Sequence, residues 1–324
     1  MKKVIKIVAY LAIAIVVIII GGAAYVTFAL PNVGDPENIK VDITPQRISH
    51  GKYLAYNVLA CVDCHSKRDW TKLGGPIDTT TLGGGGELFD QAGAGFPGEV
   101  YVPNITPYKL VNWTDGELFR AIVTGQRKNG NAIFPLMPWP YYSKLDREDI
   151  YDVIAYIRSL KPIKADYPQS KLDFPLNIIV HTMPKKAELG TKPDVKDTLK
   201  FGAYMVQSSA CMECHSQDDK GTLLPGLEFA GGRPFKINGG TVKSANITPD
   251  MATGIGGWTK EMFIAKFKSF SDRKNAVSVK PGGFQTVMPW WGYGGMSENE
   301  LGAIYTYLRT LKPVKNSVVK FASN

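Results

Sequence analysis

The apolar residues of the chain form one unbroken run near the N-terminus and periodic stripes further on. Lys2, Lys3 and Lys6 precede the run, which extends from residue 7 to residue 30. About 20 apolar residues suffice to span a bilayer, whereas the cores of signal peptides are shorter. No clear A-x-A cleavage site closes the run. The pattern predicts an uncleaved transmembrane anchor over residues 1–30, with the lysines in the cytoplasm and the remainder of the chain exported.

After the anchor, apolar residues recur every three or four positions, which is typical of helices that bury one face. The clearest stripes cover residues 150–160 and 301–311. Ser297 and Glu300 form a capping box before the second stripe, and Asp146 is the expected N-cap of the first. Shorter helices are expected in the middle of each half of the chain and before each cysteine motif.

A series of short motifs occurs twice, with an offset of about 150 residues, which indicates duplication of one domain. We call residues 46–162 copy 1 and residues 198–324 copy 2. Residues 31–45 are expected to form a tether, and residues 163–197, which have no repeat partner, an ordered connector lying across both copies. The matched segments are 51–54 with 202–205, 61–65 with 211–215, 104–107 with 246–249, 113–114 with 258–259, 137–139 with 288–290, and 160–162 with 311–313.

Each copy contains the pattern Cys-x-x-Cys-His, and the two motifs use all four cysteines of the chain. This pattern is typical of covalent haem attachment, in which each thiol adds to a vinyl group of the porphyrin and the imidazole coordinates the iron. The motif residues are Cys61, Cys64 and His65 in copy 1, and Cys211, Cys214 and His215 in copy 2.

Other uses of paired cysteines explain the motifs less well. A zinc site with four sulfur ligands leaves the histidine after each second cysteine unexplained. A thioredoxin-like redox pair needs a βαβ context, which the sequence does not indicate. A structural disulfide does not require the histidine either. The motifs therefore predict two covalently bound haem c groups, with His65 and His215 as axial ligands of the iron.

The sixth position on each iron needs another ligand, and a methionine thioether raises the reduction potential. Met137 and Met288 each occur in the sequence Met-Pro-Trp, just before the last helix of their copy. Methionine also fills gaps in hydrophobic cores, but the repeated tripeptide favours ligation. His50 and His181 are the other histidines; neither has a repeat partner, and both are expected at the surface or between the domains.

The net charge of +9 favours an anionic partner. Lysines are scattered rather than clustered, so nucleic acid is not expected as a partner, whereas an acidic protein or simple solubility explains the charge. Glycine-rich stretches in both copies lack the ending of a phosphate-binding loop, which argues against nucleotide binding. Arg233 is a candidate partner for a haem propionate.

The chain resembles the membrane-associated cytochrome c subunits of bacterial alcohol, gluconate and related dehydrogenases. The resemblance covers nearly all of the exported part, although subunits of that family commonly have three haem domains and this chain has two. It implies an all-α fold of two tandem class I cytochrome c domains, with His/Met haems and a role in electron transfer. The resembling segments are 51–55, 246–250, 253–256, 258–259, 307–309 and both Met-Pro-Trp sites.

Two functions remain open at this point. The first is a dihaem electron carrier on the outer face of the bacterial inner membrane, in the periplasm. It would link a respiratory dehydrogenase or quinol-oxidising complex to a terminal oxidase or other cytochrome. The alternative is a dihaem peroxidase, in which one iron must be open. Two equivalent methionine sites favour the carrier, because they close both irons. No catalytic residue is predicted.

Overall fold

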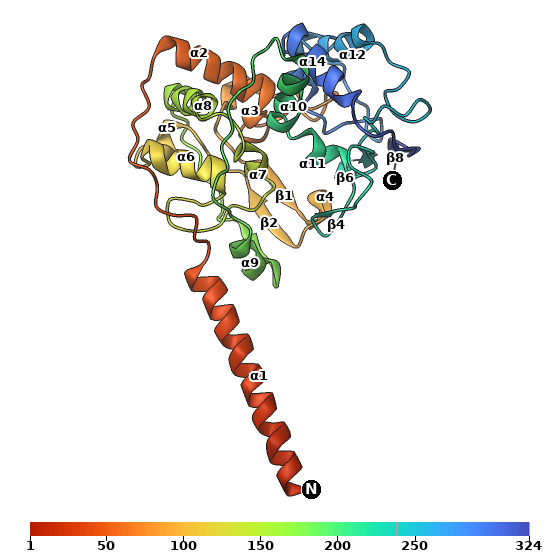
Figure 1. Ribbon diagram of the computed structural model, residues 1–324. Coiled ribbons are helices and arrows are strands. Elements are labelled where there is room, and N and C mark those ends of the chain that lie inside the picture. The colour runs from red at the N-terminus through yellow and green to blue at the C-terminus, as the bar shows by residue number, and fades with distance from the viewer. Residues whose placement is uncertain (238, 324) are drawn as a thin grey trace.

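The computed structural model describes residues 1–237 and 239–323, which form a globular body and one projecting helix (Figure 1). The projecting helix, α1 (Lys2–Ala29), contains 28 residues with a mean hydropathy of 2.9 over its most apolar window. Within the described residues it alone is long and apolar enough to cross a membrane. The predicted apolar helix at the N-terminus is confirmed.

The body is mainly helical, and its two copies lie side by side, with α2 and α8 in one and α10 and α14 in the other (Figure 1). The helices of copy 1 are α2 (Pro45–Tyr53), the π-helical turn η1 (Leu54–Val58), α3 (Cys61–Cys64), η2 (Thr79–Thr81), α4 (Gln91–Ala94), α5 (Pro107–Leu110), α6 (Asp115–Thr124), α7 (Trp139–Tyr142) and α8 (Arg147–Ser159). Those of copy 2 are α10 (Thr198–Ser208), α11 (Cys211–His215), α12 (Lys260–Lys268), η4 (Arg273–Asn275), α13 (Trp290–Tyr293) and α14 (Glu298–Leu308). The connector contributes α9 (Leu176–Ile179) and η3 (Val180–Thr182).

The helix starts follow the capping residues that the sequence provides. Asp146 caps α8 by accepting a hydrogen bond from the Glu148 N–H. Ser297 and Glu300 cap α14 reciprocally, in the predicted capping box. Such a cap satisfies backbone N–H groups that lack a partner within the helix.

A glycine in each copy lets the first helix cross the last one closely. A Cβ at Gly51 would lie 1.8 Å from the carbonyl oxygen of Asp152 in α8. A Cβ at Gly202 would lie 2.0 Å from the carbonyl oxygen of Ala303 in α14. Backbone-to-backbone contact at these crossings therefore requires glycine, which explains why the residue recurs in both copies.

In the described residues, three small antiparallel sheets accompany the helices, so the all-α prediction is incomplete. The strands contain two to four residues each, too few to produce a recognisable alternation of apolar and polar positions. Most of them lie in glycine- and proline-rich segments, whose composition indicates loops; β8, near the C-terminus, does not. The sheets are β1 (Leu88–Asp90), β2 (Gly98–Tyr101) and β3 (Lys171–Leu172); β4 (Asp218–Asp219) and β5 (Thr222–Leu223); and β6 (Pro234–Ile237), β7 (Gly240–Lys243) and β8 (Phe321–Ser323).

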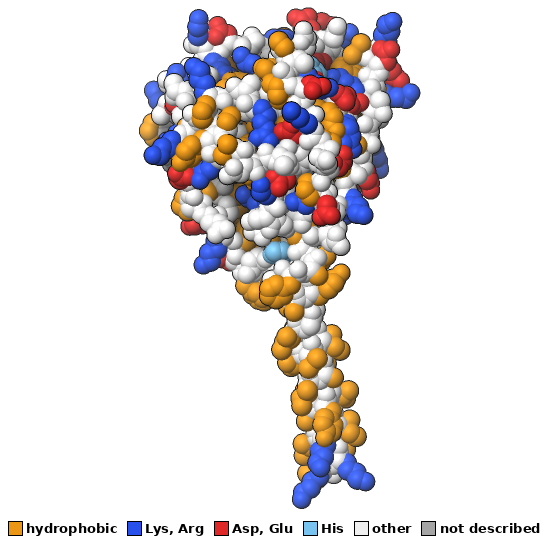
Figure 2. Space-filling model, turned by 90° about the vertical axis from the view of Figure 1, so that its left-hand side faces the viewer, with side chains coloured by type: hydrophobic (Ala, Val, Ile, Leu, Met, Phe, Trp, Pro, Cys, Tyr) orange, Lys and Arg blue, Asp and Glu red, His pale blue; other side chains and the backbone are white. Residues whose placement is uncertain are grey.

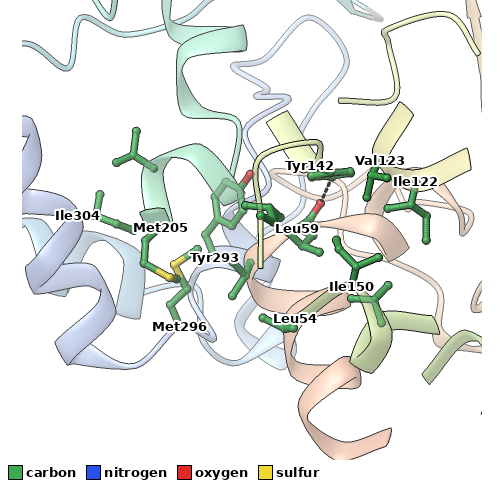
Figure 3. Close-up of a cluster of buried hydrophobic side chains, with 14 of the residues drawn as sticks. Leu54, Leu59, Ile122, Val123, Tyr142, Ile150, Met205, Tyr293, Met296 and Ile304 are labelled. Carbon is green, nitrogen blue, oxygen red and sulfur yellow. Dashed lines mark hydrogen bonds between the residues drawn. The ribbon is translucent and has the colours of Figure 1, made fainter. Parts of the chain in front are cut away.

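The hydrophobic core is continuous across the two copies. Ile150 and Leu301, from equivalent positions of α8 and α14, are both fully buried in one cluster. Figure 3 shows side chains from both copies meeting in this cluster, with Tyr293 and Leu59 near its middle. The copies are therefore packed as one body.

The segments outside the copies are also packed. The expected tether follows the surface of copy 1, where the Val41 N–H donates to Asp115 Oδ2 at 2.8 Å. The connector contains β3, α9 and η3 and contacts mainly copy 1, for example through the pairing of β3 with β2. It reaches the junction with copy 2 through Lys192, whose Nζ lies 3.0 Å from Asp149 Oδ1.

Candidate haem-attachment sites

One continuous cavity of about 3010 Å³ lies in the body. Ordinary ligand pockets measure roughly 300–1,000 Å³, so this cavity has room for more than one large ligand. It brings together every residue that the sequence predicts as an attachment point or iron ligand. These lining residues are Cys61, Cys64, His65, Met137, Cys211, Cys214, His215 and Met288.

The cysteine motifs occupy matching short helices, α3 and α11. Ala60 and Ala210 precede them in the left-handed conformation, with φ of 51° and 48°. This conformation is unfavourable for a residue with a Cβ, so surrounding contacts must hold it. Buried tyrosines provide equivalent contacts. Tyr142 donates to the carbonyl of the residue before Ala60 at 2.7 Å, and Tyr293 does the same for copy 2 at 2.8 Å.

The two motif histidines are oriented by backbone carbonyls. His65 Nδ1 lies 2.8 Å from the carbonyl oxygen of Pro103, and His215 Nδ1 lies 2.7 Å from that of Ala245. A carbonyl only accepts, so Nδ1 carries the hydrogen and Nε2 keeps its lone pair. Burial lowers the pKa of His65 to about 4 and also lowers the pKa of His215. Both imidazoles are therefore neutral and have a free nitrogen suited to a metal.

The carbonyls that hold the histidines belong to segments fixed by matching asparagines. The Asn104 side chain donates to the carbonyl of Ile163 at 2.8 Å, just after the last helix of copy 1. The Asn246 side chain donates to the carbonyl of Val314 at 2.8 Å, at the same place in copy 2. In both copies the asparagine oxygen also accepts from the N–H two residues on, at 2.9 Å. The histidine orientation thus depends on the fold around the last helix.

The Met-Pro-Trp segments adopt the same tight turn in both copies. The Trp139 N–H donates to the Met137 carbonyl at 2.7 Å, and Trp290 and Met288 repeat the bond at 2.7 Å. The intervening prolines have φ near −75° and positive ψ, as in an inverse γ-turn. Other methionines, such as Met183, also line the cavity. The shared turn, rather than cavity lining alone, distinguishes Met137 and Met288.

An ion pair lies beside the cavity in each copy, with its charges exchanged. In copy 1, Arg68 follows the motif by three residues and pairs with Glu87, at 3.0 Å from Arg68 Nε. In copy 2, Asp218 has the position of Arg68 and Arg233 has that of Glu87. Arg233 also donates to Glu213 Oε1 at 2.7 Å. Arg233, the candidate partner for a haem propionate, therefore already pairs with the carboxylates of Asp218 and Glu213.

Sequence reasoning missed Arg127. Its side chain lines the cavity, and in the described residues its guanidinium makes no hydrogen bond or ion pair. Burial lowers its pKa, and its charge also disfavours protonation of His65. A guanidinium in this setting suits a carboxylate of a bound ligand. The copies differ in length in this region, so the repeat gave no signal for it.

The remaining histidines do not form a second set of equivalent ligands. His50 lies outside the cavity wall and pairs through Nδ1 with Asp152 Oδ2 at 2.7 Å. His181 lines the cavity, and its Nδ1 lies 3.2 Å from the carbonyl oxygen of Leu30. It is thus placed at the junction of anchor and connector, rather than between the two copies.

Two tyrosines join the copies about an approximate two-fold axis. Tyr53, in copy 1, donates to Glu300 in the first turn of α14, and the α14 N-cap N–H donates to the Tyr53 hydroxyl at 3.1 Å. Tyr204, in copy 2, donates to Asp149 in the first turn of α8 at 2.6 Å, and the α8 N-cap N–H donates to it at 3.1 Å. Each copy thus caps the last helix of the other.

The paired cysteines, the neutral histidines and the shared cavity form the arrangement expected for c-type haem attachment, and known proteins with similar sequences are cytochromes. The chain is 27% identical over 285 residues to the cytochrome c subunit of alcohol dehydrogenase (quinone) from Gluconacetobacter polyoxogenes, covering 83% of this chain and 57% of the relative. It is 29% identical over 276 residues to the fructose dehydrogenase cytochrome subunit of Gluconobacter japonicus, covering 82% and 52%. It is 26% identical over 249 residues to a diheme cytochrome c-type protein of Cereibacter sphaeroides, covering 74% and 79%.

The relatives confirm the predicted resemblance to cytochrome c subunits of dehydrogenases and imply covalently bound haem c. They are electron-transfer cytochromes and not catalytic subunits. The chain spans about half the length of the two dehydrogenase subunits. A comparison with models of known protein families gives no match.

Proposed function

We propose that this chain is a membrane-anchored dihaem cytochrome c that passes single electrons between redox proteins. The observation that carries the proposal is the repetition of one donor set around one cavity. In each copy, two cysteines, a carbonyl-oriented histidine and a methionine in a tight turn line that cavity. Similarity to cytochrome subunits and to a diheme cytochrome supports the same function.

The residues present fit two haem c groups, which supply reversible one-electron chemistry when bound. In copy 1, Cys61 and Cys64 would hold the porphyrin, and His65 and Met137 would ligate the iron. In copy 2 the same roles fall to Cys211, Cys214, His215 and Met288. Arg127 would neutralise a propionate. The donor set of one histidine and one thioether is that of electron-transferring cytochromes.

The chain's own contribution is to hold these ligands and restrict water. The bonds to Pro103 and Ala245 fix the imidazole tautomer, and the lowered pKa values of His65 and His215 keep protons from competing with the metal. The continuous core and the tyrosine contacts keep the two sites in one body. Because the relatives are cytochrome subunits and not catalytic subunits, the oxidation of a substrate would take place in a partner protein.

We assign residues 46–162 and 198–324 to two class I cytochrome c domains joined by the connector. Helix α1 would span the inner membrane once, with its lysines in the cytoplasm and both haem domains in the periplasm. The donor would be a respiratory dehydrogenase or a quinol-oxidising complex, and the acceptor a terminal oxidase or another cytochrome. The net charge of +9 would favour an acidic docking face on such a partner.

Stopped-flow reduction and reoxidation of the full-length protein in detergent tests this function. We expect rapid electron uptake from a membrane dehydrogenase, delivery to an oxidase or cytochrome, and slower exchange as the salt concentration rises. A peroxide-turnover assay on the half-reduced protein runs in parallel. Robust peroxide turnover, together with failure to exchange electrons with any redox protein, would contradict the proposal.

A further inference from the structure

The C-terminal end of α1, where the helix meets the globular body, is packed against the connector. Ala23, Val26 and Leu30 follow helical spacing and are half-buried, whereas the rest of the helix is almost entirely exposed. Helix α1 contacts α9 and η3, and the His181 imidazole donates to the carbonyl of Leu30 at 3.2 Å. Figure 1 shows α9 beside the end of α1 at the base of the body. The base of the body is therefore fixed to the anchor.

The length of the anchor sets the depth of this junction. The apolar run from residue 7 to residue 30 measures roughly 36 Å at about 1.5 Å per residue. The hydrocarbon core of a bilayer is about 30 Å thick. With Lys6 at one surface, the last turns of α1 reach the opposite headgroup layer. By the same count Ala23 lies about 26 Å from Lys6 and Leu30 about 36 Å, so a segment packed on them lies at the boundary between the hydrocarbon core and that layer.

The surface at this depth is apolar. Phe174, just before α9, is 77% exposed, and Ile179, the last residue of α9, is 45% exposed. Phe28 of α1 is 88% exposed. Residues 174–180 contain no charged side chain, and Pro175 is exposed. Figure 2 shows hydrophobic side chains gathered where the body meets α1. Apolar and aromatic side chains of this kind are more stable at a lipid interface than in water.

We propose that the base surface, formed by Phe28, Phe174, Pro175 and Ile179, inserts into the outer headgroup layer of the membrane. The inference rests on the proposed anchor and goes beyond it, because it fixes the orientation of the body. Lipid is the occupant because the surface is continuous with a helix that spans the bilayer. No free tether separates them, since residues 31–44 follow the surface of copy 1, with Val41 bonded to Asp115.

The orientation has a consequence for the cavity. Pro175 and Ile179 of the base surface also line the cavity, as do Leu172, Leu176 and Val180 of the same segment, whereas Phe28 and Phe174 lie outside the cavity wall. The wall on that side would therefore face the membrane. Electron exchange with a partner dissolved in the periplasm would have to use other parts of the cavity rim.

Nitroxide accessibility in lipid vesicles tests the base surface. The full-length holoprotein is reconstituted in vesicles of phosphatidylcholine and phosphatidylglycerol, with a nitroxide at Phe174→Cys. A label at Val319→Cys serves as control, because Val319 is 73% exposed and precedes β8, which lies at the side of the body away from α1. A label at Ile18→Cys, in the middle of α1, reports the anchor. Collision rates are measured with oxygen, which concentrates in lipid, and with a water-soluble nickel complex.

We expect the label at residue 174 to collide several-fold less with the nickel complex than the label at residue 319, and more with oxygen. Equal, water-like values at residues 174 and 319 with a lipid-like value at residue 18 would overturn the inference and leave the anchor intact. A water-like value at residue 18 would overturn the anchor, and the inference with it. Protection of residue 174 in native membranes but not in vesicles would assign the surface to a protein partner and overturn the lipid contact.

Discussion

Copy 1 and copy 2 arrange the same groups around the cavity, but copy 1 encloses its charges more tightly and with the opposite polarity. The side chains of Arg68 and Glu87 are 8% and 15% exposed. Those of Arg233 and Asp218, which exchange these positions, are 25% and 21% exposed. The attraction between two charges is unchanged when they swap places. The duplicated fold therefore accommodates either polarity of the charged pair beside the second cysteine.

A second difference concerns the acidic residue inside each cysteine motif. Tyr141 of copy 1 donates to Glu213 of copy 2 at 3.2 Å. The equivalent of Tyr141 in copy 2 is Gly292, so Asp63 receives no such hydroxyl. Asp63 is only 6% exposed, and burial raises its pKa to about 6, although nearby arginine charges oppose the shift. At the interface, the motif carboxylate of copy 2, Glu213, therefore has a hydrogen bond from the other copy, whereas that of copy 1, Asp63, is buried without one from Gly292.

Removal of one cysteine pair should have the largest effect, and it tests whether the two copies attach haem independently. Cys61→Ser with Cys64→Ser should remove the haem of copy 1 alone, and Cys211→Ser with Cys214→Ser that of copy 2 alone. The intact mass after extraction of unbound haem should fall by one haem group in each case. A mass equal to the bare polypeptide in the unaltered protein would show that neither motif carries covalent haem.

Replacement of either methionine should change one site and spare the other. Met137→Ala or Met288→Ala should abolish the sulfur-to-iron charge-transfer band of one haem and lower its reduction potential by on the order of 0.1 V, because the thioether favours the reduced iron. Met183→Leu is the control, since Met183 lines the cavity outside the turn. An unchanged spectrum in both alanine variants would contradict methionine ligation and make His181, which lines the cavity, the alternative candidate ligand.

Breaking the ion pair should cost more stability in copy 1 than in copy 2. Glu87→Gln leaves the buried Arg68 charge unpaired, and such a loss costs about 3–5 kcal/mol. Asp218→Asn should cost about 1 kcal/mol or less, because the pair is more exposed, is 3.7 Å long and leaves Glu213 beside Arg233. Denaturant unfolding monitors both variants.

The double variant Arg68→Asp with Glu87→Arg sharpens this test. It gives copy 1 the polarity of copy 2 and should recover most of the stability lost in Glu87→Gln. If the exchanged pair is as unstable as the broken one, the surroundings of the pair, and not its complementarity, determine which residue is accepted.

The tyrosine contacts between the copies should have a smaller effect than the broken ion pair of copy 1. Tyr204→Phe should lower the free energy of unfolding by about 1–2 kcal/mol, because the hydroxyl bonds Asp149, which is 5% exposed. Tyr53→Phe should cost less, since Glu300 and Ser297 still cap each other. Calorimetry of both variants and their combination measures the difference. A larger effect of Tyr53→Phe would contradict the assignment of the stronger contact.

Local patterns predicted much of this molecule, and the features they missed have no local pattern in the sequence. The caps at Asp146 and Ser297, the apolar stripes of α8 and α14, and the α1 helix depend on neighbours within one or two turns, so the sequence displays them directly. The cysteine motifs and Met-Pro-Trp segments were visible because each occurs twice.

Other features leave no such pattern. The strands are too short to show alternation, and Arg127 lies where the copies differ in length. The exchanged pair of Arg68 and Glu87 looks like a loss of conservation between copies until the two side chains are seen together. The tyrosine contacts join residues about 250 and about 55 positions apart, and no periodicity links such positions.

A spectroelectrochemical titration of the full-length holoprotein tests the central claim most directly. The account predicts two electrons per chain, taken up in one-electron steps by two haems, each with the low-spin spectrum of a histidine–methionine pair in the oxidised state. A single reducible centre per chain, or a high-spin component from an iron without its sixth ligand, would contradict it.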